Sequence, residues 1–420
     1  MTKQFTVLGA GSVGISTAMH LQQRGFEVTL IDRQSPATAT SFGNAGVIND
    51  SSFIPINNPG LIKKLPRLLL NNRPELRYSY SHVLKNLPWC FNFLRSATAA
   101  KSVETANALA ALVTDALDEH RALMQRVGNM HRLSKSGWLK VYRRDVDEFF
   151  TQRDNELLSA HNIGIQHLNA AQIQELEPAL KPIFKSGYLL TDSAAVNNPG
   201  ALLKEYVDFF SSSGGKFVQS AVTGLRQSNN EGDANSFKIE TAGGDLSADN
   251  LVVCAGPWSG SVLEWLGYRV MLQVERGYHQ HFKQSDGQRL TRPLHDVDGG
   301  YIFAPMEPGL RITTGVELQH RDAAPNHSQL QQVIPRAKEA VDLGEPTDDP
   351  IWMGCRPTFP DSRPVIDRAP AHENLWLAFG HQHIGLMSGP VTGKLLVQMI
   401  CGEKPDVDLM PFAASRWISR

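Results

Sequence analysis

Cysteine is scarce in this chain of 420 residues, and the four cysteines that occur lie far apart. They are Cys90, Cys254, Cys355 and Cys401, and no two of them form a Cys-x-x-Cys pair. This spacing argues against a disulfide framework and against a zinc site, and it favours a reducing compartment. Histidines 279 and 281 alternate on an expected strand, but no third ligand is evident, so we expect no metal site.

The chain also lacks an excess of charge of one sign and any long apolar run. Its 41 Lys and Arg residues balance 42 Asp and Glu residues, which leaves a formal net charge of −1 and gives no global signal for nucleic-acid binding. No apolar run approaches the ~18 residues of a membrane-spanning helix, and the first strand-like run begins at Phe5, which leaves no room for a secretory leader. We expect a cytoplasmic protein of two or three domains.

The first 32 residues have the pattern of a βαβ unit. A short apolar run at 5–8 leads into a glycine-rich turn, a helical segment at 15–23 and a second apolar run at 26–31. Gly25 stands where the helix ends, a position that suits the left-handed conformation of glycine. The complete strand, turn, helix and strand predict a site for the ADP half of a dinucleotide.

Each glycine of the dinucleotide pattern has a physical role. Gly9 permits the tight turn, Gly11 lets the backbone approach a pyrophosphate, and Gly14 lets helix and strand pack closely. The helix N-terminus offers unpaired N–H groups to the phosphates, and Asp32 is placed to accept hydrogen bonds from ribose hydroxyls. By itself this unit fits FAD and NAD equally. The residues predicted to contact the cofactor here are Gly9, Ala10, Gly11, Ser12, Val13, Gly14, Asp32 and Arg33.

Signals of a buried parallel sheet recur further along the chain. They lie at 215–256 and 375–400, whereas the alternation at 270–282 and 301–316 favours an antiparallel sheet. A long helix is expected at 99–127. Because the two kinds of signal are interleaved, we predict two domains that the chain crosses several times.

Residues 61–95 are both basic and apolar, with Glu75 as the single acid among several lysines and arginines. A segment of this kind can lie on an anionic membrane surface. It can equally be an ordinary helical segment whose apolar side packs into the core. The sequence leaves both interpretations open, and the first predicts peripheral contact with the inner face of the cytoplasmic membrane.

Several further motifs occur in order after the βαβ unit. They are Thr40-Ser41-x-x-Asn44-Ala45-Gly46, Cys254-Ala255-Gly256-Pro257-Trp258-Ser259, Gly354-Cys355-Arg356-Pro357-x-x-Pro360-Asp361, Phe379-Gly380-His381-x-x-x-Gly385-Leu386 and Pro411-Phe412-x-x-x-Arg416. With them the chain resembles the FAD-dependent amine oxidoreductases of the glycine/D-amino-acid oxidase superfamily. It is most similar to bacterial D-amino-acid dehydrogenases of the small-subunit type, and the resemblance covers nearly the whole chain.

The resemblance implies an α/β fold with a Rossmann-like FAD-binding domain of the GR2 type. This domain would comprise 1–57, 191–262 and 355–420. It would be interleaved with an α+β substrate domain, built on a mixed or antiparallel sheet, from 58–190 and 263–354. The resemblance also implies non-covalent FAD. Some sarcosine oxidases of the superfamily attach FAD through a cysteine near the position of Cys355, but the Arg-Pro that follows here resembles the non-covalent branch.

The resemblance also implies which later residues meet FAD. From the residues alone, the small and turn-forming stretch at 38–46 is either a surface loop or a cofactor contact, and the resemblance places it along the pyrophosphate and flavin. The segment after 379 leads into a helix whose N-terminal N–H groups would face the flavin N1–C2=O edge and stabilise negative charge there. The further cofactor residues implied are Ser41, Asn44, Ala45, Gly46, Val222, Gly256, Trp258, Gly380, His381, Gly385 and Leu386.

On the substrate side the resemblance points first to Arg356, whose planar guanidinium can bind a carboxylate through two parallel hydrogen bonds. From sequence alone a surface or ion-paired arginine is the preferred interpretation of Arg356, and the resemblance reverses that preference. Tyr301 matches a tyrosine whose hydroxyl assists at the carboxylate, and Tyr278 begins a strand that lines the substrate cavity; the alternative for Tyr301 is a packed strand tyrosine. His383 stands where the substrate preference of the subgroup is expected to be set, and it titrates near neutrality when unperturbed.

The implied chemistry is hydride transfer from the substrate Cα–H to flavin N5. The imino product hydrolyses to a 2-oxo acid and ammonia, and the electrons pass to a quinone or to O₂. Three hypotheses follow. The first is a dehydrogenase of D-amino acids, including cyclic D-imino acids such as D-proline or hydroxy-D-proline. The second is a glycine or sarcosine-type oxidase that uses O₂. The third is a non-catalytic or NAD-binding Rossmann protein.

Overall fold

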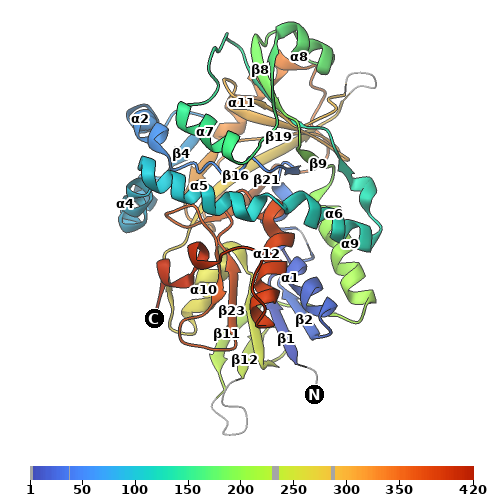
Figure 1. Cartoon of the computed structure of the whole chain (residues 1–420), viewed down its shortest axis with the longest axis vertical. Coiled ribbons are helices and arrows are strands. Elements are labelled where there is room, and N and C mark those ends of the chain that lie inside the picture. The colour runs from blue at the N-terminus through green and yellow to red at the C-terminus, as the bar shows by residue number, and fades with distance from the viewer. Residues whose placement is uncertain (1–2, 37, 229–235, 285–288) are drawn as a thin grey trace.

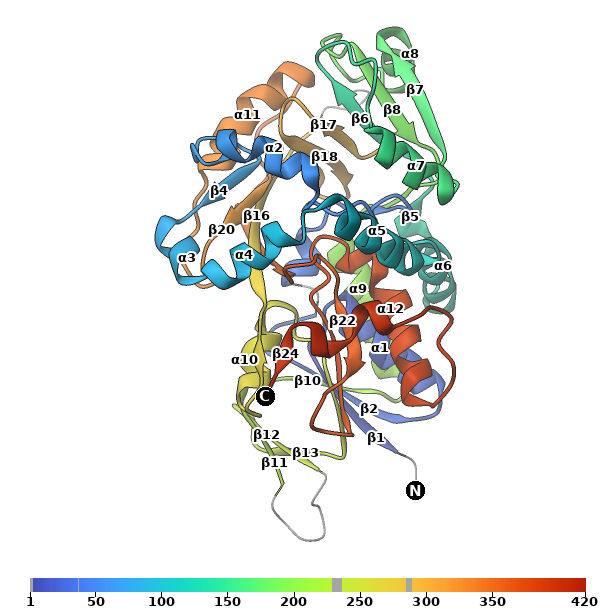
Figure 2. The same ribbon diagram turned by 60° about the vertical axis from the view of Figure 1, so that its left-hand side comes forward.

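The chain folds into two layers, each built on its own β-sheet, and Figures 1 and 2 show them one above the other. The computed structural model describes residues 3–36, 38–228, 236–284 and 289–420. In the view of Figure 1 both marked ends of the chain belong to the lower layer. Within the described residues, no helix combines the length and the apolar character needed to cross a bilayer.

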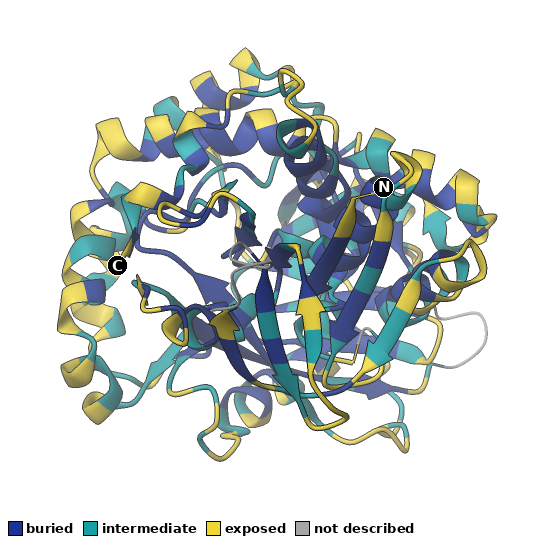
Figure 3. Cartoon of the chain, turned by 90° about the horizontal axis from the view of Figure 1, so that it is seen from below, coloured by how far each residue is buried: buried dark blue, intermediate teal, exposed yellow. Residues whose placement is uncertain are grey.

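The lower layer is centred on a six-stranded sheet that brings the two ends and the middle of the chain together. Its strand order is β10 (Lys216–Gln219), β2 (Glu27–Asp32), β1 (Gln4–Leu8), β14 (Asn250–Val253), β23 (Leu375–Phe379) and β22 (Val365–Arg368). All neighbours pair in parallel except β22, which is antiparallel to β23. The three parallel signals of the sequence therefore meet in one sheet, whose central strands β1, β14 and β23 are largely buried, as their apolar composition indicates. Figure 3 shows these strands as largely buried ribbons inside a shell of more exposed helices.

Helices cover one face of this sheet. They are α1 (Ser12–Gln23), α9 (Pro199–Ser212), α12 (Gly385–Ile400), α5 (Ala99–Val113) and α6 (Ala116–Val127). Gly389 and Gly393 of α12 let that helix approach α1 closely, because an added Cβ at either position would collide with Ser12 or with the backbone at 16–17. On the opposite face lie α10 (Ser259–Glu264) and a small antiparallel sheet of β11 (Val222–Gln227), β12 (Phe237–Thr241) and β13 (Leu246–Ala248).

The segment at 99–127 differs from its sequence interpretation in two respects. It forms two helices, with a break after Val113, where the sequence predicts one. The sequence groups it with the substrate segments 58–190, but its buried side chains, such as Leu109 and Met124, share a core with α1 and α12. Helical periodicity identifies the apolar face of a helix, but it does not indicate which sheet that face will pack against.

The upper layer is a mixed sheet of ten strands. Its order is β4 (Leu76–Tyr78), β20 (Val316–Leu318), β16 (Gln273–Phe282), β19 (Gly309–Thr313), β18 (Tyr301–Met306), β17 (Leu294–Asp296), β6 (Trp138–Tyr142), β8 (Ser186–Leu190) and β7 (Ile165–Asn169), with β21 (Trp352–Thr358) also paired to β16. Side chains alternate between the two faces of such a sheet. One face packs on α8 (Ala170–Leu176) and α11 (Ser328–Ala340), and the other contributes to a cavity between the two layers.

Short elements connect the layers. A three-stranded sheet of β3 (Val47–Ile48), β9 (Ala194–Val196) and β5 (Leu133–Ser134) joins three crossings of the chain. The segment at 59–95 forms α2 (Pro59–Leu68), α3 (Tyr80–Lys85) and α4 (Leu87–Arg95) beside the upper sheet (Figure 2). Trp89 anchors α4, because its buried indole N–H donates to the Thr358 carbonyl at 3.1 Å.

Much of the apolar content of 61–95 is exposed. We call the following side chains the apolar–basic surface: Ile62, Leu69, Leu70, Tyr80, Leu84, Leu87, Phe91 and Leu94, together with the basic residues Lys63, Lys64, Arg67 and Lys85 between them. Leu84 and Phe91 expose 68% and 67% of their surface. The interpretation of 61–95 as a segment with its apolar side in the core is therefore wrong for these residues.

Candidate active site

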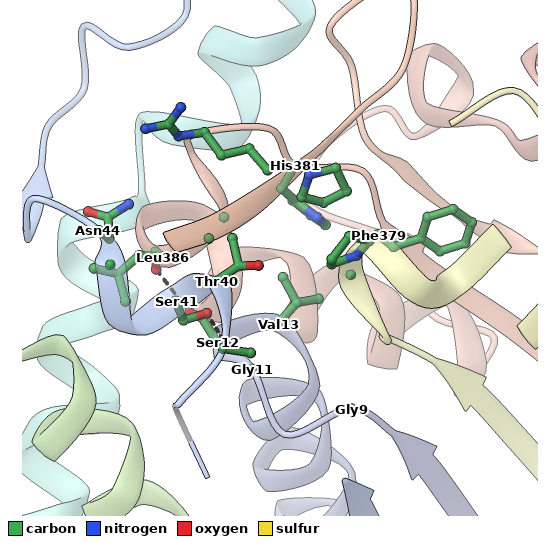
Figure 4. A pocket seen from close by; sticks show the side chains of 18 of the residues that line it. Gly9, Gly11, Ser12, Val13, Thr40, Ser41, Asn44, Phe379, His381 and Leu386 are labelled. Carbon is green, nitrogen blue, oxygen red and sulfur yellow. Dashed lines mark hydrogen bonds between the residues drawn. The ribbon is translucent and has the colours of Figure 1, made fainter. Parts of the chain in front are cut away.

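A cavity of about 500 Å³ lies between the two layers. Its lower wall consists of the β1–α1 turn, the loop at 38–45, and the ends of β14 and β23; its upper wall is one face of the ten-stranded sheet. Figure 4 shows part of this wall, where the turn at Gly9 and Gly11 faces the segment from Phe379 to Leu386. Segments far apart in the sequence thus surround one space.

The β1–α1 turn has the backbone geometry that its glycines predict. Gly9 has a φ of 106°, and an added Cβ would lie 2.5 Å from the Cys254 carbonyl oxygen. A Cβ on Gly14 would collide with the Gly9 carbonyl, so this glycine packs α1 against β1. Gly11 differs, because the only atom near its missing Cβ is Ser41 Oγ at 3.5 Å. Its backbone therefore remains open to the cavity.

Two helix N-termini face the cavity, and neither receives a capping hydrogen bond from the side chain of its own N-cap residue. Gly11 precedes α1 and Ile384 precedes α12. Both positions line the cavity. The first N–H groups of a helix have no intrahelical acceptor and carry the positive end of the helix dipole. These two termini are therefore suited to an anionic ligand such as a pyrophosphate.

Asp32 lines the cavity at the end of β2, where its carboxylate organises the backbone around it. Oδ2 accepts a hydrogen bond from the Ala10 N–H at 2.7 Å, and Oδ1 accepts one from the Gln34 N–H at 2.9 Å. Each carboxylate oxygen has a second lone pair for a ribose hydroxyl. The open Gly11 backbone, the two helix N-termini and Asp32 together fit the phosphate and ribose groups of a dinucleotide.

The loop at 40–46 is held in place by both layers. The Ser12 N–H donates to Ser41 Oγ at 3.2 Å and the Ser12 hydroxyl donates to the Leu386 carbonyl at 3.1 Å, as Figure 4 shows. Asn44 Nδ2 donates to the His383 carbonyl at 3.3 Å. This loop is therefore part of the site and not a free surface loop.

Arg311, a residue that the sequence analysis missed, fixes the same loop from above. Its side chain is buried, and Nη1 donates to the carbonyl oxygens of Phe42 at 2.8 Å and Asn44 at 2.6 Å, while Nε donates to His281 Nε2 at 3.0 Å. Burial lowers the pKa of Arg311 to about 9. The sequence does contain a signal for Arg311, because it is a charged residue at an inward-facing position of the otherwise apolar strand β19.

The remaining predicted cofactor residues also surround the cavity, with two exceptions. Val222, Gly256 and Trp258 line it, as do Gly380, His381, Gly385 and Leu386. The Arg33 guanidinium lies 3.7 Å from the centre of the Trp258 ring, which fixes both side chains at the edge of the site. The exceptions are Gly14 and Gly46, which serve packing: a Cβ on Gly46, whose φ is 75°, would collide with the Val196 carbonyl.

Arg356 lines the cavity on β21, and most of its donors are available to a ligand. Its guanidinium lies over Gly277, where an added Cβ would collide with it. Its one hydrogen bond within the described residues runs from Nη1 to the Gly315 carbonyl at 3.3 Å. Burial lowers the pKa of Arg356, and buried Glu275, its partner in the strand register, opposes that shift. A guanidinium carries five N–H donors, so Arg356 can bind a carboxylate with two of them.

Tyr278 and Tyr301 do not line the cavity, contrary to the sequence prediction. Both side chains point to the opposite face of the upper sheet, into the core beneath α11. The Tyr278 hydroxyl donates to Glu317 Oε2 at 2.5 Å, and the Tyr301 hydroxyl lies 3.4 Å from the Arg336 carbonyl. Because side chains alternate along a strand, their neighbours Gly277 and Ile302 face the cavity instead.

The two histidines after β23 both line the cavity, but neither is set up to exchange protons near neutral pH. His381 is buried with Nε2 3.0 Å from Thr392 Oγ1, and burial lowers its pKa to about 3. His383 is exposed to the cavity. Its pKa is lowered to about 4 by desolvation, then by the positive charges of Arg356 and Lys140.

Cys355 faces away from Arg356. Its side chain is buried on the other face of β21, where Sγ lies 3.9 Å from the Arg321 carbonyl, and burial raises its pKa to about 11. It does not line the cavity. Within the described residues, no group of three His, Cys, Asp or Glu side chains is placed to hold a metal ion.

Comparison with known proteins gives a family for this architecture. The family model described as FAD dependent oxidoreductase matches residues 4–399. A D-amino-acid oxidase of Bradyrhizobium diazoefficiens is 31% identical, with 99% of each chain covered. A D-amino acid dehydrogenase of Helicobacter pylori is 25% identical, again with 99% of each chain covered.

Solved structures share the fold at lower sequence identity. Glycine oxidase from Geobacillus kaustophilus has a TM-score of 0.70 at 18% identity, with 100% of each chain covered. L-Proline dehydrogenase from P. horikoshii has a TM-score of 0.73 at 15% identity, with 99% of this chain and 98% of that chain covered. At these identities the likeness establishes the fold alone.

Proposed function

The chain belongs to the FAD dependent oxidoreductase family, and from that premise we propose that it oxidises small D-amino acids at the Cα–N bond. The observation that carries this proposal is Arg356, whose guanidinium faces the cavity with most of its donors unused. The names of the relatives from Bradyrhizobium and Helicobacter support D-amino acids as the substrate class.

The residues of the cavity fit FAD. The α1 terminus and Gly11 would hold the pyrophosphate, Asp32 the ribose, and the α12 terminus the electron-rich edge of the flavin. When bound, FAD supplies a two-electron acceptor for the substrate. The binding is proposed to be non-covalent, since the Cys355 thiol lies on the far face of β21.

Arg356 would hold the α-carboxylate through paired hydrogen bonds and so fix the direction of the substrate Cα–H. Positioning of this kind can lower a barrier by several kcal/mol. His381 and His383 remain neutral above pH values of about 3 and 4, so neither takes up a proton from the substrate amine near neutrality. The amine would lose its proton to solvent, and the imino product would hydrolyse to a 2-oxo acid and ammonia.

Anaerobic mixing of the purified yellow enzyme with a panel of amino acids tests this function. The panel contains D- and L-amino acids, D-proline, hydroxy-D-proline, glycine and sarcosine. We expect the flavin absorbance to bleach with D-amino acids and to persist with their L-enantiomers. Bleaching by glycine or sarcosine alone would support an amine oxidase instead, and a colourless protein that cannot be reconstituted with FAD would contradict both.

For the electron acceptor and location we propose a membrane quinone, reached from the apolar–basic surface. Exposed apolar side chains and interspersed lysines and arginines suit an anionic lipid surface. The surface adjoins the site, because Trp89 of α4 is bonded to Thr358, two residues from Arg356. O₂ is the competing acceptor.

Vesicle sedimentation tests this location. We expect the holoenzyme to pellet with vesicles of anionic lipid and to stay in solution with zwitterionic ones. The double change Leu84→Glu and Phe91→Glu should abolish pelleting and slow reoxidation by a vesicle-borne quinone. Met410, which is 76% exposed and lies outside this surface, provides the matched control as Met410→Glu. Fast reoxidation by O₂ with release of hydrogen peroxide, together with no vesicle binding, would contradict the proposal.

A further inference from the structure

One row of side chains crosses the cavity-facing side of the upper sheet. The strand registers place opposite one another, from β8 to β21, the residues Tyr188, Lys140, His295, Ile302, Thr313, His279 and Trp352. Directly opposed residues in a sheet share a face. Ile302, Thr313 and Trp352 of this row line the cavity, so Lys140 belongs to the same face as the site.

Lys140 has a positively charged side chain with no acidic partner among the described residues. Its ammonium lies 4.2 Å from the centre of the Trp138 ring and 5.7 Å from that of Tyr188, and Trp138 lines the cavity. Within the described residues, no acidic side chain or hydrogen-bond acceptor opposes the desolvation of this ammonium. Desolvation lowers the pKa of Lys140 to about 8, so it is mainly protonated at neutral pH.

Lys140 is half-buried, and partial desolvation opposes its positive charge. A cation over an aromatic ring gains about 0.5–2 kcal/mol, and no acid within the described residues adds to that gain. An anionic group of a ligand would supply the missing partner. Neighbouring His295 does not, because an imidazole carries no negative charge; burial and the charge of Lys140 lower its pKa to about 3 and keep it neutral.

Lys140 and Arg356 act on the same part of the cavity. His383, which is exposed there, feels both positive charges, and each of them lowers its pKa. Arg356 on β21 lines the cavity, and Lys140 on β6 lies beside the cavity-lining Trp138, with His383 in electrostatic range of both cations. Arg356 suits the α-carboxylate common to all amino acids, which leaves Lys140 for a group that only some of them carry.

We propose that the site selects D-amino acids with an anionic side chain, and that Lys140 is the residue that recognises this second negative group. The inference rests on the proposed function, since Arg356 is taken to bind the α-carboxylate. It names acidic D-amino acids, such as D-aspartate and D-glutamate, as the preferred class within the D-amino acids.

Rates of anaerobic flavin reduction with isosteric pairs test this selectivity. We expect the holoenzyme to favour D-glutamate over D-glutamine and D-aspartate over D-asparagine, each by at least about tenfold, the size of one charge-assisted hydrogen bond. Lys140→Gln should reduce these ratios at least about tenfold, and Lys140→Arg should largely retain them. Lys185→Gln, at an exposed lysine just before β8, is the matched control and should keep the ratios.

A binding measurement separates this inference from the proposed function. Glutarate should perturb the flavin spectrum at a lower concentration than butyrate does, and Lys140→Gln should remove that difference. Equal or faster reduction by the neutral amides, or ratios unchanged in Lys140→Gln, would overturn the role of Lys140 while leaving D-amino-acid oxidation intact. Failure of every D-amino acid to bleach the flavin would contradict the proposed function, and the glutarate titration would still decide whether Lys140 binds a second carboxylate.

Discussion

At the residue scale, the site depends on which side chains still have unused hydrogen-bonding groups. Arg356 has one hydrogen bond to the described part of the chain, whereas the Tyr278 hydroxyl contacts Glu317, Arg276 and the Asn326 N–H. A group with its bonding capacity already used inside the protein has little to offer a substrate. Arg356 is therefore the residue whose replacement should affect substrate binding most directly.

Replacing Arg356 by Gln should raise KM for D-amino acids by roughly 30- to 1000-fold, because paired charge-assisted hydrogen bonds worth about 2–4 kcal/mol are lost. The bound flavin should be retained, since Arg356 is not part of the phosphate cradle. The KM of Arg356→Lys should lie between those of the wild type and Arg356→Gln, because lysine keeps the positive charge and loses the paired guanidinium donors. Steady-state kinetics and the flavin absorbance per protein provide the two measurements. A KM unchanged in Arg356→Gln would remove Arg356 from the site.

At the scale of single elements, different glycines of the β1–α1 turn serve helix packing and the approach of a ligand. Two of its glycines are fixed by nearby backbone atoms, and the third, Gly11, faces open space. The loop at 40–46 is a second such element, held by Ser12 from below and by Arg311 from above. A substitution in these elements should therefore lower the stability of the fold if it contacts packed backbone. It should weaken cofactor binding if it faces the cavity.

Two alanine substitutions in the turn should differ in their effects on thermal stability and on FAD binding. Gly14→Ala should lower the unfolding temperature of the apoprotein, because the new Cβ collides with the Gly9 carbonyl. Gly11→Ala has a compatible backbone, with φ −75° and ψ −179°, and should leave that temperature nearly unchanged while weakening FAD binding about tenfold or more. Thermal unfolding and FAD titration measure the two effects. Full FAD affinity in Gly11→Ala would show that the cofactor does not pass close to this backbone.

Arg311→Met should loosen the loop at 40–46 and weaken FAD binding. The change leaves the partly buried carbonyls of Phe42 and Asn44 without this donor, at a cost of about 1 kcal/mol for each. We expect faster release of flavin, followed by the rise in flavin fluorescence on dilution. The exposed Arg144→Met is the control, since its surface ion pair with Asp298 contributes about 0–1 kcal/mol. Equal flavin release from the two variants would contradict a role for Arg311 in holding the loop.

At the scale of the whole molecule, buried neutral histidines should make the fold sensitive to acid. Burial lowers the pKa of His120 to about 4 and that of His381 to about 3, against about 6.5 in an unfolded chain. Below pH 6.5 the unfolded chain binds protons that the folded chain does not, so stability falls as pH falls. The stability from these two groups is fully present above about pH 6.5 and is lost progressively toward pH 4 and below.

The unfolding temperature of the holoenzyme should therefore decrease steadily between pH 7 and pH 5. At pH 5 each such histidine accounts for about 1–2 kcal/mol. His120 Nε2 is 3.0 Å from the Leu386 carbonyl, a contact that an amide can replace, so His120→Gln should show a shallower decrease. Calorimetry at several pH values measures this slope, and a slope identical in wild type and His120→Gln would assign the acid sensitivity to other groups.

The sequence by itself determined the elements whose signals are local. The βαβ unit, the parallel strands at 215–256 and 375–379 and the helix at 385–400 depend on glycine positions and on periodicity within each segment. The family resemblance carried by the sequence also pointed to Arg356 and to most of the residues that line the cavity. Contacts within one strand, turn or helix involve neighbours in the chain, and their pattern is therefore visible without the fold.

Tertiary structure alone decided which face of each element meets the site. Alternation along β16 and β18 indicates two faces, but only the packing of α11 on one of them turns Tyr278 and Tyr301 away from the cavity. The same sheet brings Lys140 and Arg311 toward the site from strands far from Arg356 in the sequence. The tertiary packing also leaves many of the apolar side chains of 61–95 exposed. These outcomes depend on the order and register of strands in the sheet. Either face of a strand could be buried favourably, and only the layer that packs on the sheet decides which one is.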